Sequence, residues 1–164
     1  MQLTFFTDYC FRVLIYLAQH PDEKATIDQL QSYFGISRNH LVKVVHWLAK
    51  HDYVATRRGK GGGITLNRSP VDINVGEVFG QAEQRLDLVE CMGPNCKCRI
   101  VQQCGLQGVI RAGLAAFVQV VDGYTLADVA GIAGAIEDPV QQTDFQPGQL
   151  LNGCAGPGVS RSES

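Results

Sequence analysis

The pattern that most constrains the fold is a series of three helical periodicities and a glycine-tipped basic hairpin in residues 7–66. Apolar residues recur at helical spacing through residues 7–20, which predicts a first helix. Pro21 ends that helix because proline disfavours helical backbone in the residue before it. Thr26 begins a second helix, and Gln29 three residues later completes a capping-box pattern. The chain therefore opens with two helices joined by a short turn.

The following segment adds a third helix and a hairpin. Gly35 suits the tight turn after the second helix, and Ser37 can cap a third helix over residues 38–51. Residues 53–56 and 64–66 have strand-like composition, and the run RGKGGG between them predicts a turn. Two helices joined by a glycine-containing turn match helix-turn-helix spacing, and the hairpin extends the pattern to a winged helix. We therefore expect a mostly α fold with a small β-hairpin.

A long apolar helix follows the expected winged helix. From residue 105 to residue 121 apolar side chains recur at helical spacing, and this is the longest such pattern in the chain. A helix this apolar, lying beyond a complete small domain, needs a partner surface, and a second copy of the chain is the simplest one. Packing onto its own domain is the other possibility. We expect a long dimerisation helix.

The chain divides into four expected regions. These are a winged-helix DNA-binding domain that ends in a fourth helix, an irregular cysteine-containing loop, a dimerisation helix with a short terminal helix, and a glycine- and proline-rich tail expected to be disordered. Their boundaries are residues 1–84, 85–104, 105–130 and 131–164, in that order.

Basic residues are concentrated in one part of a chain whose formal net charge is −2. Residues 38–68 contain seven lysines and arginines and a single acid, Asp52. From residue 71 onward there are five basic residues and eleven acids. Such a local excess indicates an anion-binding face, although a solvated basic surface explains the charge alone equally well. The winged-helix pattern favours double-stranded DNA as the anion.

The DNA-binding residues are expected on the third helix and on the wing. In a winged helix the third helix enters the major groove, and its first residues face the base edges. Arginine can pair with guanine and asparagine with adenine, whereas basic residues at the wing contact phosphate or the minor groove. The expected DNA-binding residues are Ser37, Arg38, Asn39, His40 and Lys43 on the helix, and Arg57, Arg58 and Lys60 on the wing. A dimer would present two such helices about one DNA turn apart, so a palindromic operator is expected.

Four of the six cysteines, Cys91, Cys96, Cys98 and Cys104, lie within fourteen residues. Structural zinc, redox sensing through a disulfide, and an iron–sulfur cluster compete as explanations. The spacings fit the paired cysteines of zinc sites only loosely, whereas several thiolates in a loop beside a dimerisation helix suit a cluster best. Nothing else in the chain supplies chemistry, so we do not expect an enzyme.

The cellular compartment bears on these thiols. No apolar run reaches the roughly 18 residues that a transmembrane helix needs, and the N-terminus lacks the basic flank and cleavage site of a signal peptide. We therefore expect a cytoplasmic protein without a membrane partner. Structural disulfides are disfavoured in the cytoplasm, which favours metal binding or redox sensing by the cysteines.

Residues 1–130 resemble the winged-helix iron–sulfur regulator family that contains IscR, and within it the nitric-oxide-responsive repressors. The motifs that carry the resemblance are the opening MQLTFFTDYCFRVLIYLA, the helix SRNHLVKVVHWLAKHDYV, the wing RRGKGGGITL, the three-cysteine loop and YTLADV. The resemblance implies a homodimeric transcriptional repressor with one [4Fe–4S] cluster in each subunit. It also implies that nitric oxide attacks the cluster, that DNA is released, and that genes for nitric oxide detoxification are expressed.

The resemblance further implies which cysteines bind the cluster. The family motif has three cysteines with five residues between the last two. In this chain the last two are Cys98 and Cys104, and Cys91 is the first. Cys96 is then an additional thiol and an alternate to Cys98 as the middle ligand.

The fourth ligand is implied to come from another subunit. In the nitric-oxide-responsive members it is an aspartate near the N-terminus of the partner, and Asp8 matches that position. The residues alone indicate only an acid near a helix N-terminus, where the helix dipole favours negative charge. Arg12, one turn later, is expected to orient Asp8.

Two alternatives are left open. IscR-like members bind a [2Fe–2S] cluster with a histidine three residues after the last cysteine, and this chain has Gln107 there. Such a regulator would sense iron–sulfur status or redox state. An alternative from a different class, an iron–sulfur redox protein that does not bind DNA, would not account for the basic wing.

Overall fold

The computed structural model describes residues 3–83 and 86–134 of the 164-residue chain. The expected tail beyond residue 134, including Cys154, lies outside the described residues, and so do the two residues at the expected boundary between the first two regions. Within the described ranges, no helix is both long enough and apolar enough to cross a membrane.

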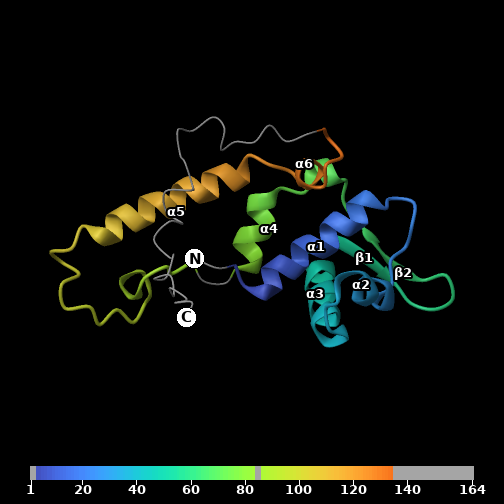
Figure 1. Ribbon diagram of the computed structural model, residues 1–164, viewed down its shortest axis with the longest axis horizontal. Helices are drawn as coiled ribbons and strands as arrows, with labels where there is room; N and C mark the ends of the chain where they lie inside the picture. Colours follow the sequence, from blue (N-terminus) through green and yellow to red (C-terminus); the bar gives the residue numbers. More distant parts are fainter. Residues whose placement is uncertain (1–2, 84–85, 135–164) are drawn as a thin grey trace, which may run out of the picture. The chain divides into compact units, whose positions relative to one another are not determined.

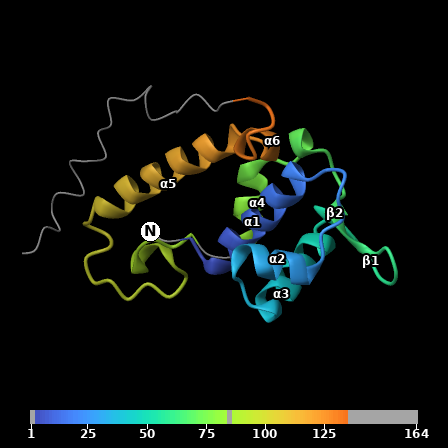
Figure 2. The same ribbon diagram turned by 45° about the vertical axis from the view of Figure 1, so that its right-hand side comes forward.

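Helices and one β-hairpin make up the described structure, as the sequence predicts (Figure 1). In chain order the elements are α1 (Phe5–Gln19), α2 (Ile27–Phe34), α3 (Arg38–Lys50), β1 (Val54–Arg57), β2 (Gly63–Leu66), the 3-10 helix η1 (Pro70–Asp72), α4 (Val75–Ala82), the 3-10 helix η2 (Glu90–Met92), α5 (Leu106–Asp122) and α6 (Leu126–Val129). The strands pair antiparallel, with Val54 opposite Leu66 and Arg57 opposite Gly63. In Figures 1 and 2 the loop between the strands extends away from the helices.

Local capping sets where the first three helices begin. α1 begins two residues before its predicted start because the Thr4 hydroxyl accepts the N–H of Thr7 at 3.3 Å. The predicted capping box of α2 is present, since Thr26 accepts the N–H of Gln29 and the Gln29 side chain accepts the N–H of Thr26. Ser37 occupies the N-cap position of α3, but its side chain makes no capping hydrogen bond.

The core lies where α1, α2, α3 and the hairpin meet. Gly35 ends α2 in the left-handed conformation, with φ of 67°, as the sequence predicts. Each of the three helices then buries one face, and the fully buried side chains include Leu14, Leu30, Leu41, Leu48 and Tyr53. Full burial of one leucine contributes about 1.5–3 kcal/mol of hydrophobic free energy. This packing fixes the orientation of α3 and leaves its opposite face in solvent.

The wing is attached to the core by the segment between α1 and α2. Ala25 and Ile64 exchange both backbone hydrogen bonds, at 3.0 and 2.8 Å, and so add a short bridge to the edge of β2. Gly62 admits no side chain, because a Cβ there would lie 2.3 Å from the carbonyl oxygen of Arg57. Gly62 is therefore a steric requirement of this hairpin.

α5 is apolar but is not buried by its own chain. None of its 17 residues is buried, and Val109 and Leu106 are 69% and 56% exposed. One side-chain contact between α5 and α4 is an edge-to-face pair of Phe117 and Phe79, whose ring centroids lie 5.2 Å apart. Large exposed apolar patches of this kind mark interaction surfaces in soluble proteins.

The C-terminal end of α5 is joined closely to the start of α4. The Asn74 side chain donates to the Asp122 carbonyl at 2.7 Å, and the Val75 N–H donates to the Tyr124 carbonyl at 2.9 Å. Gly76 allows this approach, because a Cβ at that position would lie 1.7 Å from Oδ1 and 3.0 Å from Cα of Asp122. The α4–α5 joint, formed by residues 74–76 and 122–124, therefore depends on a glycine.

Gly76→Ala tests this joint. The added methyl forces the Asp122 side chain to rotate and presses on its backbone, so we expect the free energy of unfolding to fall by about 1–3 kcal/mol. Urea unfolding followed by circular dichroism, at a fixed protein concentration, measures the change.

Gly80→Ala in the same helix is the matched control. A Cβ at Gly80 meets nothing within 4 Å, so this change is expected to raise stability by about 0.5–1 kcal/mol through helix propensity. If Gly76→Ala were as stable as Gly80→Ala, the close approach of the two helices would be wrong.

Candidate functional site

The exposed face of α3 carries the residues expected to read DNA. Arg38, Asn39, His40 and Lys43 are all exposed, whereas Leu41, Val44, Val45 and Leu48 on the opposite face are buried. The buried residues hold the helix against α1 and α2, so that its polar face is rigidly presented. Figure 2 shows α3 at the surface, next to α2.

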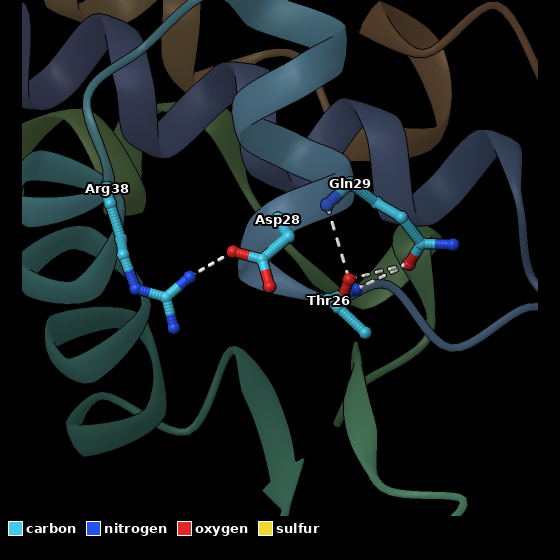
Figure 3. A network of polar contacts seen from close by, with 4 residues as sticks. All are labelled: Thr26, Asp28, Gln29 and Arg38. Carbon is cyan, nitrogen blue, oxygen red and sulfur yellow. Dashed lines mark hydrogen bonds and ion pairs between the residues drawn. The ribbon is translucent and has the colours of Figure 1, made fainter.

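Arg38, at the first position of α3, is not free in the described structure. Its Nη1 forms an ion pair and hydrogen bond with Oδ1 of Asp28, which lies in the first turn of α2 (Figure 3). The side chains of both residues are largely exposed, at 57% for Arg38 and 77% for Asp28. The predicted base-reading arginine is therefore held by a carboxylate that sequence reasoning did not single out.

His40 is oriented by two neighbours. Its Nδ1 lies 3.0 Å from the Ser37 hydroxyl, with either group able to donate, and its ring lies 6.0 Å from the Tyr9 ring between centroids. The Ser37 hydroxyl therefore orients the exposed His40 side chain and does not cap the backbone of α3.

The wing places three exposed cations beside α3. Arg57, Arg58 and Lys60 are all exposed on β1 and on the turn that follows it. A groove of about 420 Å³ separates the wing from α3, and Arg57, Arg58, Val42 and His46 are among its lining residues. Of the predicted DNA-binding residues, Arg57 and Arg58 line this groove, whereas its α3 side is formed by other residues, Val42, Val45, His46 and Ala49.

Val42 is a residue of this face that sequence reasoning missed. It is 48% exposed and lies one turn after Arg38 on α3. An exposed apolar side chain on a recognition helix can contact the methyl group of thymine. Residues four apart share one face of a helix, so the position of Val42 four residues after Arg38 could have placed it on this face.

Arg68 was counted with the basic residues of this region but has a different environment. Its guanidinium lies 4.5 Å from the centroid of the Tyr53 ring and 3.5 Å from the Glu77 carboxylate. The Tyr53 hydroxyl donates to Gln81 at 3.0 Å, and burial, together with the neighbouring Glu77 charge, raises the pKa of Tyr53. Arg68 therefore joins the end of the wing to α4.

The cysteine loop has little regular structure apart from η2. Cys91, Cys96, Cys98 and Cys104 are free thiols, and all are partly exposed. The Gln107 side chain, at the start of α5, donates to the Cys91 carbonyl and so ties the two ends of the loop together. The thiols are chemically suited to iron, because an iron–sulfur cluster is held by cysteine thiolates.

The predicted ligands are not assembled in the single chain. Among residues 3–83 and 86–134, no three histidine, cysteine, aspartate or glutamate side chains are grouped so that they could hold a metal ion. The donor types fit a cluster, but the loop would have to close around it, as metal sites commonly do when binding is coupled to folding.

Asp8 and Arg12 lie together on the exposed side of α1. Arg12 Nε donates to Asp8 Oδ2 at 2.9 Å, and the Asp8 side chain is 39% exposed. The start of α1 is itself fixed by Glu83 at the end of α4, whose Oε1 accepts the N–H of Thr4 at 2.7 Å. Asp8 is thus an oriented, accessible carboxylate. The start of its helix is bonded to Glu83, which lies shortly before the cysteine loop along the chain.

Cys10 differs from the clustered thiols. It is fully buried in the core, and burial raises its pKa to about 12. A thiol with this pKa is protonated at neutral pH and is a poor metal ligand or nucleophile. Cys10 is therefore a small residue of the hydrophobic core.

The chain is similar to known transcriptional regulators over most of its length. The family model of Rrf2, described as an iron-dependent transcriptional regulator, matches residues 3–131. The regulator NsrR of Bacillus subtilis is 46% identical over 131 residues, covering 79% of this chain and 90% of NsrR. NsrR of Shouchella clausii is 44% identical over the same length, covering 79% and 88%.

Solved structures of regulators share the fold. IscR from T. potens has a TM-score of 0.62 at 21% identity, covering 92% of this chain and 96% of that one. The global cysteine regulator CymR of B. subtilis has a TM-score of 0.61 at 21% identity, covering 80% and 97%. At these identities the comparison establishes the winged-helix fold alone.

Arg38→Ala and Lys60→Ala separate base reading from phosphate binding. We expect Arg38→Ala to weaken binding to a preferred duplex by about 5- to 150-fold more than binding to a scrambled duplex, since it removes a base contact. Lys60→Ala should weaken both equally and lower the salt dependence by about one ion.

Fluorescence anisotropy with a duplex selected from a randomised library, and with its scrambled counterpart, measures both effects. Equal losses on the two duplexes for Arg38→Ala would rule out a role in base readout.

Proposed function

The chain belongs to the Rrf2 family of transcriptional regulators, and from this premise we propose that it is a homodimeric repressor that releases its operator in response to nitric oxide. The observation that carries the proposal is the set of four free, partly exposed thiols between α4 and the uncovered helix α5. A basic surface can bind DNA but cannot respond to a chemical signal, whereas a set of thiols can hold an iron–sulfur cluster that does. The NsrR relatives support the choice of signal.

Three thiolates and one carboxylate are proposed to hold a [4Fe–4S] cluster. Cys91, Cys98 and Cys104 provide the thiolates, with Cys96 as the alternate to Cys98, and Asp8 of the partner subunit completes the set. When bound, the cluster would supply iron that reacts with nitric oxide. A carboxylate is a harder ligand for iron than a thiolate, so the position held by Asp8 is proposed as the exchangeable one.

Arg12 is proposed as the residue that orients Asp8. Its Nε donates a hydrogen bond to Oδ2 of Asp8, and among the described residues nothing else donates to this carboxylate, so its other oxygen could act as a ligand. The pair spans one turn of α1, so the carboxylate is held in one direction without becoming buried.

The dimer is proposed to form through α5. Leu106, Val109 and Val120 are more than half exposed in the single chain, and burying them against a second copy would remove this apolar area from water. A two-fold dimer presents two copies of α3, which predicts a palindromic operator in double-stranded DNA.

Coupling between the cysteine loop and DNA is proposed to pass through α4. The loop enters α5, and α5 meets α4 at the Phe79–Phe117 contact and at the α4–α5 joint. α4 in turn contacts the base of the wing through the Arg68–Glu77 and Tyr53–Gln81 pairs. A shift of α5 would therefore act on the wing and on α1, and release from DNA would derepress the nitric oxide detoxification genes that the family resemblance implies.

The alternative of an IscR-like [2Fe–2S] regulator has less support. The residue three positions after Cys104 is Gln107, which donates its side-chain N–H to the Cys91 carbonyl. An amide is a weak iron ligand compared with imidazole, so this position is proposed to shape the loop.

A nitric oxide titration tests the proposed function. The full-length chain, purified anaerobically, should show iron–sulfur absorption in the visible region and bind a duplex selected from a randomised library. Stepwise addition of nitric oxide should bleach or shift the absorption and release the duplex in parallel. Asp8→Ala should retain some cluster but change the rate of reaction with nitric oxide or the DNA affinity.

Asp22→Ala is the control, since Asp22 is an exposed acid in the loop after α1. Unchanged absorption and unchanged DNA binding after nitric oxide addition would contradict the proposed signal. Wild-type behaviour of Asp8→Ala in both measurements would contradict only its role as a ligand.

A further inference from the structure

The ion pair between Asp28 and Arg38 joins two helices at the surface that is proposed to meet DNA. Asp28 lies in the first turn of α2 and Arg38 at the first position of α3. Figure 3 shows the Asp28 carboxylate facing one terminal nitrogen of Arg38, while the other terminal nitrogen is not paired with Asp28. The adjacent capping box of Thr26 and Gln29 fixes the first turn of α2 and hence the position of the carboxylate.

Helix dipoles favour this arrangement. A carboxylate is stabilised in the first turn of a helix, whereas a cation at that position is disfavoured. Asp28 is therefore well placed at the start of α2, and its charge offsets the unfavourable position of Arg38 at the start of α3. In the free protein the guanidinium is drawn towards α2.

The Asp28–Arg38 ion pair is weak enough for a contact with a DNA base to replace it. Both side chains are more than half exposed, and exposed ion pairs shift an equilibrium by at most about fivefold. A guanidinium that pairs bidentately with guanine favours that base by about 5- to 150-fold. A single exposed phosphate contact offers no comparable advantage over the Asp28 carboxylate, which is itself an anion.

We propose that Asp28 is a specificity-determining residue that withholds Arg38 from DNA phosphates and releases it only to a matching base. On non-matching DNA, Arg38 stays paired with Asp28. On matching DNA, the bidentate base contact replaces the ion pair. Because only binding to matching DNA breaks the ion pair, Asp28 lowers the affinity for matching DNA more than the affinity for non-matching DNA, and so narrows the ratio between them.

This inference rests on the proposed DNA-binding function, and Asp28→Asn tests it. The variant keeps the side-chain shape but removes the charge. We expect its affinity for the selected duplex to rise about two- to fivefold, with a smaller rise for a scrambled duplex, so that the specificity ratio rises. The salt dependence on scrambled DNA should increase by about one ion as Arg38 gains a phosphate contact.

Two controls isolate the pair. Asp22→Asn changes the net charge equally but lies in the loop after α1, so it should leave the specificity ratio unchanged. Asp28→Asn in an Arg38→Ala background should have no further effect on the ratio, because the partner is gone. The wild-type chain, the three single variants Asp28→Asn, Asp22→Asn and Arg38→Ala, and the double variant are compared by fluorescence anisotropy as full-length, anaerobically purified proteins.

The outcomes are distinguishable. If the wild-type chain selects no sequence from the library, the proposed function fails, and this inference fails with it. If the wild-type chain is specific but Asp28→Asn matches Asp22→Asn in its ratio, only the role of Asp28 is overturned. An effect of Asp28→Asn that persists without Arg38 would also overturn it, since the mechanism requires the pair.

Discussion

The uncovered apolar face of α5 is the constraint on which the other features depend. This helix carries large apolar residues such as Val109, yet none of its residues is buried by the described part of its own chain. Because exposed apolar area of this extent is unfavourable in water, α5 requires a covering surface. We propose that a second copy of the chain covers it symmetrically, which would place the cysteine loop at the start of α5 beside the dimer interface.

The same helix is well placed to transmit a change at the loop. Its C-terminal end is joined to α4 through Gly76 and Asp122, and α4 is joined to the wing through Arg68 and Tyr53. The contact between α5 and α4 includes a short hydrogen bond, and the contact between α4 and the wing includes the Tyr53 ring. A displacement of α5 therefore acts on α4 without a long flexible connection between them.

Much of the fold follows from local sequence. The capping box at Thr26 and the left-handed Gly35 are set by interactions within a few residues, so their patterns predict them correctly. The early start of α1 was missed because the hydroxyl of Thr4, just outside the apolar pattern, caps the helix.

The candidate site was less predictable, because its key contacts join distant elements. The pairing of Arg38 with Asp28 and the stacking of Arg68 on Tyr53 depend on how helices and wing pack, which residue spacing does not reveal. The cluster ligands present a further difficulty. Cys91, Cys98, Cys104 and Asp8 stay a prediction, since the proposed site needs two subunits and an iron–sulfur cluster to form.

Mixed dimers test the cross-subunit site most directly. One subunit carries Asp8→Ala, the other carries Cys104→Ala, and two different affinity tags allow the mixed species to be purified anaerobically. If Asp8 acts on the partner's cysteines, the mixed dimer contains one complete ligand set, and its visible absorption should respond to nitric oxide at the wild-type rate. A response at the rate of the Asp8→Ala homodimer would contradict the cross-subunit site.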